Sequence, residues 1–177
     1  MKIDDLIVEK AIQYIGKREL KGNSGFKDGE FQQLMESVGW QKGQAWCSYF
    51  AELIWKQAYV EYKPELLSEL NILFSSGAIA TFYNFKKSGE YGISKIPKPG
   101  ALIVWQTYKE IDGKLKPHWT GHIGIVESMY KDVVKTIEGN TNQSGGREGI
   151  EVTQKFRDLD FIIKKGLVLK GFIYPKE

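Results

Sequence analysis

The 177-residue sequence contains a single cysteine, Cys47, in the run QAWCSYF. This cysteine begins a predicted helix, because the residues expected to face the core recur at helical spacing: Cys47, Phe50, Ala51, Ile54, Trp55 and Ala58. Unpaired N–H groups and the positive end of the helix dipole favour thiolate over thiol at such a position. The same N–H groups can bind the oxyanion that forms when a thiolate attacks a carbonyl. The position suits a nucleophile, although a lone cysteine is more often a small hydrophobic core residue.

Two later segments offer partners for this thiol. His122 opens a predicted strand in TGHIGIV, and the next predicted strand, in VVKTIEGNTN, ends at Glu138 and is followed by Gly139 and Asn140. If these strands pair, a carboxylate or amide can accept the second ring N–H of His122 and stabilise its imidazolium. Taken singly, His122 is also consistent with a surface histidine, Glu138 with a solvated strand end and Asn140 with a turn residue. Their order favours an activated thiol that performs acyl transfer, without assigning separate roles to Glu138 and Asn140.

Several other residues are weaker candidates. Gln41 or Gln44 is a possible second oxyanion donor, and His118 in KPHWT is interpreted as a solvent-facing or substrate-loop residue. Four aromatic residues are candidates for lining a groove for sugar and peptide, although packing in the core or at an edge is the commoner role: Trp46, Trp105, Trp119 and Tyr83. One cysteine and two histidines would form a zinc site only with carboxylates, so we expect no metal and no cofactor.

Helices are expected first and strands afterwards. The first helix is expected to be capped by Asp4 or Asp5 and to end at Gly16, with an apolar face of Val8, Ala11, Ile12 and Ile15. Further helices are predicted at 31–38, from 47, at 66–74 and at 78–85. Strands are predicted at 101–107, 122–129, 133–138, 150–153 and 167–174, with a hairpin turn at 130–132. This order predicts an α+β fold with an antiparallel sheet, in a single domain spanning 1–177.

The composition narrows the class of protein further. A net charge of +3 and a pI near 8.8 are mildly basic, and no Lys/Arg cluster is dense enough to indicate nucleic-acid binding. A single cysteine cannot form an intramolecular disulfide. The first residues, MKIDDLIVEKAIQYIG, carry charges throughout, and no stretch approaches the roughly 20 apolar residues of a membrane span. We therefore expect no signal peptide, synthesis in the cytoplasm and no membrane partner.

Three segments together resemble the CHAP domains, relatives of the NlpC-type and papain-like cysteine hydrolases. The nucleophile helix of these domains is resembled by AWCSYFAELIWKQA. Their strand, loop and His-bearing strand are resembled by PKPGALIVW followed by TGHIGIVES, and their next strand, with its acid-Gly-Asn ending, by TIEGNTN. Ala101 stands where many NlpC-type relatives carry Asp, which weakens an NlpC-type assignment and leaves the CHAP resemblance unchanged. The resemblance implies a papain-like fold of N-terminal helices packed on a C-terminal antiparallel sheet. It also implies four roles: Cys47 as nucleophile, His122 as base, Glu138 as its orienting group and Asn140 as further polar support.

The resemblance further implies that the substrate amide lies in peptidoglycan. The bond is either the one between N-acetylmuramic acid and L-alanine or one within the stem peptide or cross-bridge, so the expected partner is a muramoyl or stem peptide. We expect a monomer that reaches the wall after release by a pore-forming partner, as for a phage endolysin, or by non-classical export with an immunity protein. Two alternatives remain open at this point: an inactive wall-binding phage module, and a cysteine peptidase or amidase with a non-wall substrate.

Overall fold

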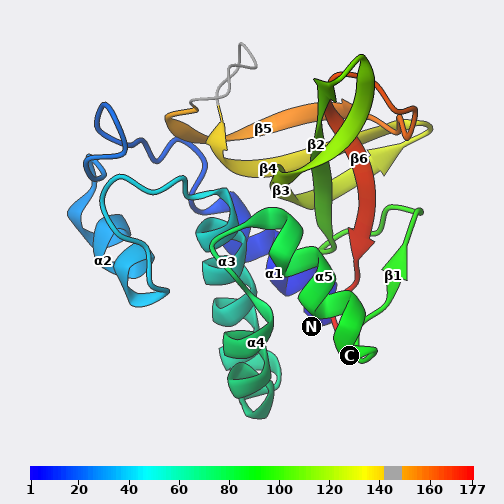
Figure 1. The fold of residues 1–177 in the computed structure, drawn as a ribbon. Coiled ribbons are helices and arrows are strands. Elements are labelled where there is room, and N and C mark those ends of the chain that lie inside the picture. Colours follow the sequence, from blue (N-terminus) through cyan, green and yellow to red (C-terminus); the bar gives the residue numbers. More distant parts are fainter. Residues whose placement is uncertain (142–148) are drawn as a thin grey trace.

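The computed structural model describes residues 1–141 and 149–177. In this part of the chain, five α-helices, mostly N-terminal, pack on a six-stranded antiparallel sheet (Figure 1). The helices are α1 (Ile3–Ile12), α2 (Gly29–Ser37), α3 (Cys47–Tyr62), the 3-10 helix η1 (Pro64–Leu66), α4 (Leu67–Leu73) and α5 (Ala78–Ser88). The strands are β1 (Ile93–Ser94), β2 (Leu102–Ile111), β3 (Lys114–Tyr130), β4 (Val133–Thr141), β5 (Glu151–Asp158) and β6 (Gly166–Ile173). The predicted α+β fold is confirmed.

The strand order β1-β6-β2-β3-β4-β5 brings the predicted site segments side by side. Trp105 of β2 lies directly opposite His122 of β3, and Ile125 of β3 lies opposite Ile137 of β4. The predicted hairpin between β3 and β4 is confirmed, with Lys131 of its turn in the left-handed region at φ 54°. Because residues directly opposite each other on paired strands have their side chains on the same face, His122 and Trp105 share one face of the sheet.

The two faces of the sheet bury different clusters. The face that packs on the helices contributes aliphatic side chains to the main core, together with the predicted inward face of α3: Leu102, Val104, Ile123, Ile125 and Ile137 from the sheet, and Phe50, Ala51, Ile54, Trp55 and Ala58 from the helix. The opposite face holds a smaller cluster: Ala101, Ile103, Trp105, Val126, Val134, Leu169 and Phe172. His122 borders the smaller cluster through its contact with Trp105, and α3, which packs against β3 and β4, carries Cys47 within hydrogen-bond reach of it.

The predicted apolar face of the first helix is wrong except at Ala11. The helix α1 begins at Ile3 and ends at Ile12, so the buried apolar stripe falls on an earlier set of residues: Ile3, Leu6, Ile7 and Ala11. Asp4 and Asp5 lie in the first turn rather than at the cap, which is Lys2. Packing of this earlier stripe against α3 decides which face is buried, and Ile12 remains exposed.

The strand that carries the histidine is longer than predicted. His122 does not open β3, because the strand already begins at Lys114 and pairs with the end of β2. His118 accordingly lies within β3, at a register shift between Gln106 and Tyr108, and not in a loop. The short strand β1 was also not predicted. Among the described residues, no helix combines the length and apolar character needed to cross a membrane.

Candidate active site

Cys47 occupies the first position of α3 and is partly exposed. Two hydrogen bonds hold Trp46, the residue before Cys47, in place. The Trp46 backbone N–H donates to Asn140 Oδ1 at 2.9 Å, and its buried indole N–H donates to the Glu19 carboxylate. The first N–H groups of a helix have no partner within the helix and form the positive end of its dipole. Cys47 therefore lies where a thiolate, and an oxyanion beside it, are stabilised.

An irregularity in β4 brings this strand against the start of α3. The register of β4 with β5 shifts between Glu138 and Thr141, and Asn140 within the shift has a positive φ of 54°, which asparagine tolerates better than most residues. At Gly139, a Cβ atom would lie 2.6 Å from Trp46 Cζ3, so the approach requires glycine. The side-chain contact of Asn140 is thus with the backbone that precedes the candidate nucleophile.

His122 and Glu138 face each other from the neighbouring strands β3 and β4. His122 Nε2–H donates to Glu138 Oε2 at 2.8 Å, and the Glu138 side chain is 0% exposed. Thr136 Oγ1 donates to the other carboxylate oxygen at 2.6 Å. A Cβ atom at Gly124 would lie 2.6 Å from Glu138 Cγ, so this glycine leaves room for the glutamate. With Nε2 bonded to Glu138, Nδ1 is the ring nitrogen left to interact with Cys47.

The electrostatics of the three side chains favour a charged histidine. Burial lowers the pKa of His122, but hydrogen bonds with Cys47 and Glu138 outweigh burial and raise that pKa to about 9. Burial alone would raise the pKa of Glu138, but hydrogen bonds from Arg157 and His122 hold it well below its usual range. At neutral pH the site therefore favours an imidazolium between a carboxylate and the cysteine. Such a histidine can protonate a leaving amine.

Two further side chains complete the surroundings of His122. The ring of His122 stacks on Trp105, with 5.7 Å between centroids and 28° between planes. Arg157 of β5 binds both oxygens of Glu138, with Nε to Oε1 at 2.8 Å and Nη2 to Oε2 at 2.5 Å. Arg157 was not predicted as a site residue from the sequence. The predicted strand ended at 153, so no sequence signal pointed to Arg157; β5 in fact continues to Asp158 and pairs with β4, which brings Arg157 to Glu138.

Comparison with known families gives one match. Residues 39–140 match the CHAP domain family. The chain belongs to the CHAP domain family. The matched segment contains Cys47, His122, Glu138 and Asn140 and ends before β5. CHAP domains are in general cysteine-dependent hydrolases. No curated protein and no solved structure matches the chain.

Within this CHAP domain, the two glutamine candidates lie in the loop that leads to Cys47. Gln44 Oε1 accepts hydrogen bonds from the Gln41 backbone N–H at 2.9 Å and from the Tyr49 hydroxyl at 3.0 Å, and its backbone oxygen accepts one from the Trp40 indole. These contacts give Gln44 a role in shaping the loop. A side-chain contribution of Gln41 or Gln44 to oxyanion binding stays a prediction.

The four aromatic candidates divide by burial. Trp46 and Trp105 are buried, whereas Trp119 is 77% exposed and Tyr83 is 46% exposed. Beside Trp119, His118 Nδ1 lies 2.7 Å from Thr120 Oγ1. The described residues contain no group of three or more His, Cys, Asp or Glu placed to hold a metal ion. The last residue of the TIEGNTN segment lies outside the described residues.

Proposed function

We propose that this CHAP domain is a peptidoglycan hydrolase that cleaves an amide bond, as an N-acetylmuramoyl-L-alanine amidase or as an endopeptidase. The observation that carries the proposal is the His122–Glu138 hydrogen bond, formed on strands packed beside the helix start that bears Cys47. A positioned histidine with a carboxylate behind it is what a thiol needs to act as a nucleophile in acyl transfer.

The first step is attack by the Cys47 thiolate on the substrate carbonyl carbon. A C–S bond forms, and the carbonyl electron pair moves to oxygen, giving a tetrahedral oxyanion. The backbone N–H groups at the first turn of α3 stabilise this oxyanion. The protonated His122, whose pKa is raised to about 9, stabilises the thiolate before attack.

The second step breaks the C–N bond. His122 gives its proton to the departing amine, and a thioester to Cys47 remains. Neutral His122 then takes a proton from a water molecule, which attacks the thioester and releases the carboxylic acid and the thiol. Glu138 holds the ring orientation throughout and stabilises the imidazolium in each half-reaction.

An exposed aromatic ring on the strand that carries His122 supports a glycopeptide substrate. Trp119 presents its ring to solvent on the irregular part of β3, three residues before His122. Gln106 Nε2 donates to the His118 backbone oxygen at 3.1 Å, which ties this part of β3 to β2. An aromatic ring held on an ordered strand offers a broad apolar face to a sugar or a peptide.

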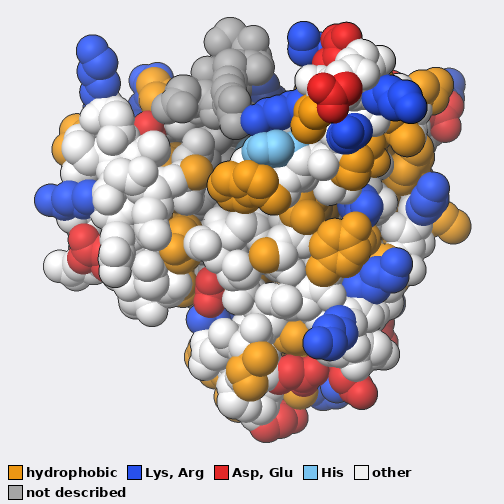
Figure 2. Space-filling model, in the orientation of Figure 1, with side chains coloured by type: hydrophobic (Ala, Val, Ile, Leu, Met, Phe, Trp, Pro, Cys, Tyr) orange, Lys and Arg blue, Asp and Glu red, His pale blue; other side chains and the backbone are white. Residues whose placement is uncertain are grey.

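The charge of the surface supports an anionic polymer as the target. Figure 2 shows Lys and Arg side chains interspersed with hydrophobic ones over β2, β6 and α5. A hollow of about 410 Å³ in this region is lined in part by Lys86, Lys95 and Lys170. Such a surface attracts an anionic wall polymer at low ionic strength. We further propose that the enzyme acts on muramoyl or stem peptides at the wall, reached by release or export.

Digestion of purified peptidoglycan tests the proposal. Wild type and Cys47→Ala are incubated with walls of several cross-bridge types, turbidity and amine release are recorded, and mass spectrometry of the fragments identifies the bond. Lysis by wild type alone supports the proposal. Wall binding without product release by either protein would favour an inactive binding module. Cleavage of peptide reporters, with no wall type attacked, would favour a peptidase with another substrate.

A further inference from the structure

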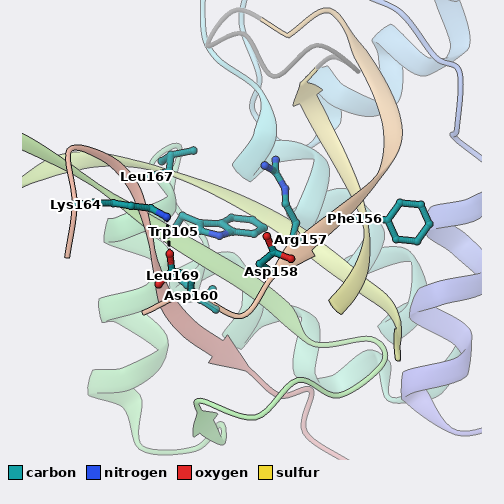
Figure 3. Close-up of a pocket in the computed structure, with 8 residues that line it drawn as sticks. All are labelled: Trp105, Phe156, Arg157, Asp158, Asp160, Lys164, Leu167 and Leu169. Carbon is teal, nitrogen blue, oxygen red and sulfur yellow. Dashed lines mark hydrogen bonds and ion pairs between the residues drawn. The ribbon is translucent and has the colours of Figure 1, made fainter. Parts of the chain in front are cut away.

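Four side chains from four neighbouring strands form a closed ring of contacts behind the candidate nucleophile. Glu138 accepts one hydrogen bond from His122 and two from Arg157. The Arg157 guanidinium in turn lies 5.0 Å from the centroid of the Trp105 ring, and Trp105 stacks on His122. Figure 3 shows Arg157 beside the Trp105 ring, with Phe156 on the other side of Arg157 from Trp105. Every member of the ring therefore contacts two others.

The geometry of Arg157 is specific to a guanidinium group. Two parallel N–H donors meet both oxygens of one carboxylate, while the planar group lies over an indole ring. Lysine has a point charge and cannot form the fork and the stack together. Since the Glu138 carboxylate is fixed at both oxygens, the oxygen that accepts from His122 cannot rotate away from the ring.

The charge of Arg157 is as important as its shape. Glu138 is fully buried, and an isolated buried carboxylate would favour its neutral form. The charged or titratable groups that face the pair are Cys47 from α3, His122 from β3, and Arg157 and Lys155 from β5. Arg157 makes the closest cationic contact with Glu138 among these, at 2.5 Å. Loss of this cation favours protonation of every neighbouring group that can take a proton.

We propose that Arg157 is a positioning residue of the catalytic centre, which clamps Glu138 and, through Trp105, fixes the plane of the His122 ring. It is not expected to touch substrate or the reacting atoms. The inference rests on the proposed function for the role of His122 as base. It extends the site beyond the segment that matches the family, because Arg157 lies after residue 140.

The pH dependence of Cys47 alkylation tests this proposal without any wall substrate. Because Cys47 is the only cysteine, the rate of carboxamidomethylation by iodoacetamide, followed by intact-protein mass, reports that thiol alone. The variants are Arg157→Gln, which removes the charge, and Arg157→Lys, which keeps it. The matched control is Lys164→Gln, because Lys164 lines the same hollow as Arg157 but pairs with Asp160 (Figure 3).

We expect the midpoint of the alkylation profile to move to higher pH in Arg157→Gln by less than about one unit, because Arg157 contacts Glu138 and not Cys47 itself. Arg157→Lys should move it by less, and Lys164→Gln should match wild type. A midpoint in folded Arg157→Gln equal to that of Lys164→Gln would overturn the proposal.

A second variant covers the case in which Arg157→Gln does not fold, as judged by circular dichroism. Arg157→Lys then tests the clamp, because the lysine ammonium group cannot bind both carboxylate oxygens of Glu138 at once. A shifted midpoint supports the clamp, and a profile identical to wild type overturns it. Wall hydrolysis by the same proteins is measured separately. Wild type that attacks no wall, together with a shifted midpoint in the Arg157 variants, would contradict the proposed function and leave the clamp supported.

Discussion

Gly139→Ala tests how β4 positions the nucleophile. A Cβ atom at this position would lie 2.6 Å from Trp46 Cζ3 and 2.8 Å from Phe50 Cβ, whereas ordinary contacts begin at 3.4 Å. The shortfall is therefore about 0.8 Å at the tryptophan and about 0.6 Å at the phenylalanine. Both aromatic side chains are buried, and neither can rotate into solvent. The start of α3 must then move away from β4 by a similar amount.

The magnitude of the effect follows from this displacement. A misplacement of about 1 Å in a catalytic constellation can cost on the order of 100-fold in rate. Overpacking of a core position costs roughly 1–3 kcal/mol of unfolding free energy. For a chain of this size, each kcal/mol corresponds to about 2–4 °C in Tm. We therefore expect Gly139→Ala to remain folded, with a lower Tm and a loss of turnover of about 100-fold.

The assay compares amine release and thermal unfolding with those of a matched glycine variant. Gly29→Ala is the control, because a Cβ atom at the start of α2 would meet nothing within 4 Å. This control should keep both activity and Tm close to wild type. Full activity in Gly139→Ala would refute the reasoning, whether or not its Tm falls, since the nucleophile would then tolerate the shift of its helix.

Three further predictions concern the candidate site and the substrate. Glu138→Gln should move the basic limb of the kcat/KM profile to lower pH, because the carboxylate that helps raise the pKa of His122 to about 9 is lost; an unmoved limb in a pH titration would contradict this. Asn140→Ala should lower kcat about 10-fold or more with little change in KM, because it releases the backbone before the nucleophile; a pure KM effect would point to substrate contact instead. Trp119→Ala should raise KM for wall fragments several-fold while the exposed control Tyr130→Ala does not, and equal effects would remove Trp119 from the substrate groove.

The elements that carry the candidate site were predicted from the sequence more accurately than the elements around them. The start of α3 at Cys47 followed from the spacing of apolar residues, and the alternation along β4 placed Ile137 and Glu138 on opposite faces. The contact between His122 and Glu138 needed only the pairing of consecutive strands, which is the commonest arrangement. These features depend on local patterns and short connections.

Other features depend on packing that no local pattern specifies. The buried stripe of α1 was misjudged because contact with α3 selects among several apolar residues on a short helix. The different contacts of Glu138 and Asn140 follow from the register shift in β4, which turns Asn140 toward the helix. Arg157 reaches Glu138 only in the observed register of β4 and β5, in which Arg157 lies opposite Val134. One residue of slippage would place it on the other face.

The most direct test of thiol-dependent hydrolysis is titration of the only cysteine against activity. Wild-type protein is alkylated with iodoacetamide to graded extents, the modified fraction is measured by intact mass, and amine release from purified peptidoglycan is recorded for each sample. We predict that activity falls in proportion to the unmodified fraction of Cys47 and reaches zero, with Cys47→Ala also inactive. Amine release that persists in fully alkylated protein or in Cys47→Ala, or its absence from untreated wild type, would contradict the account.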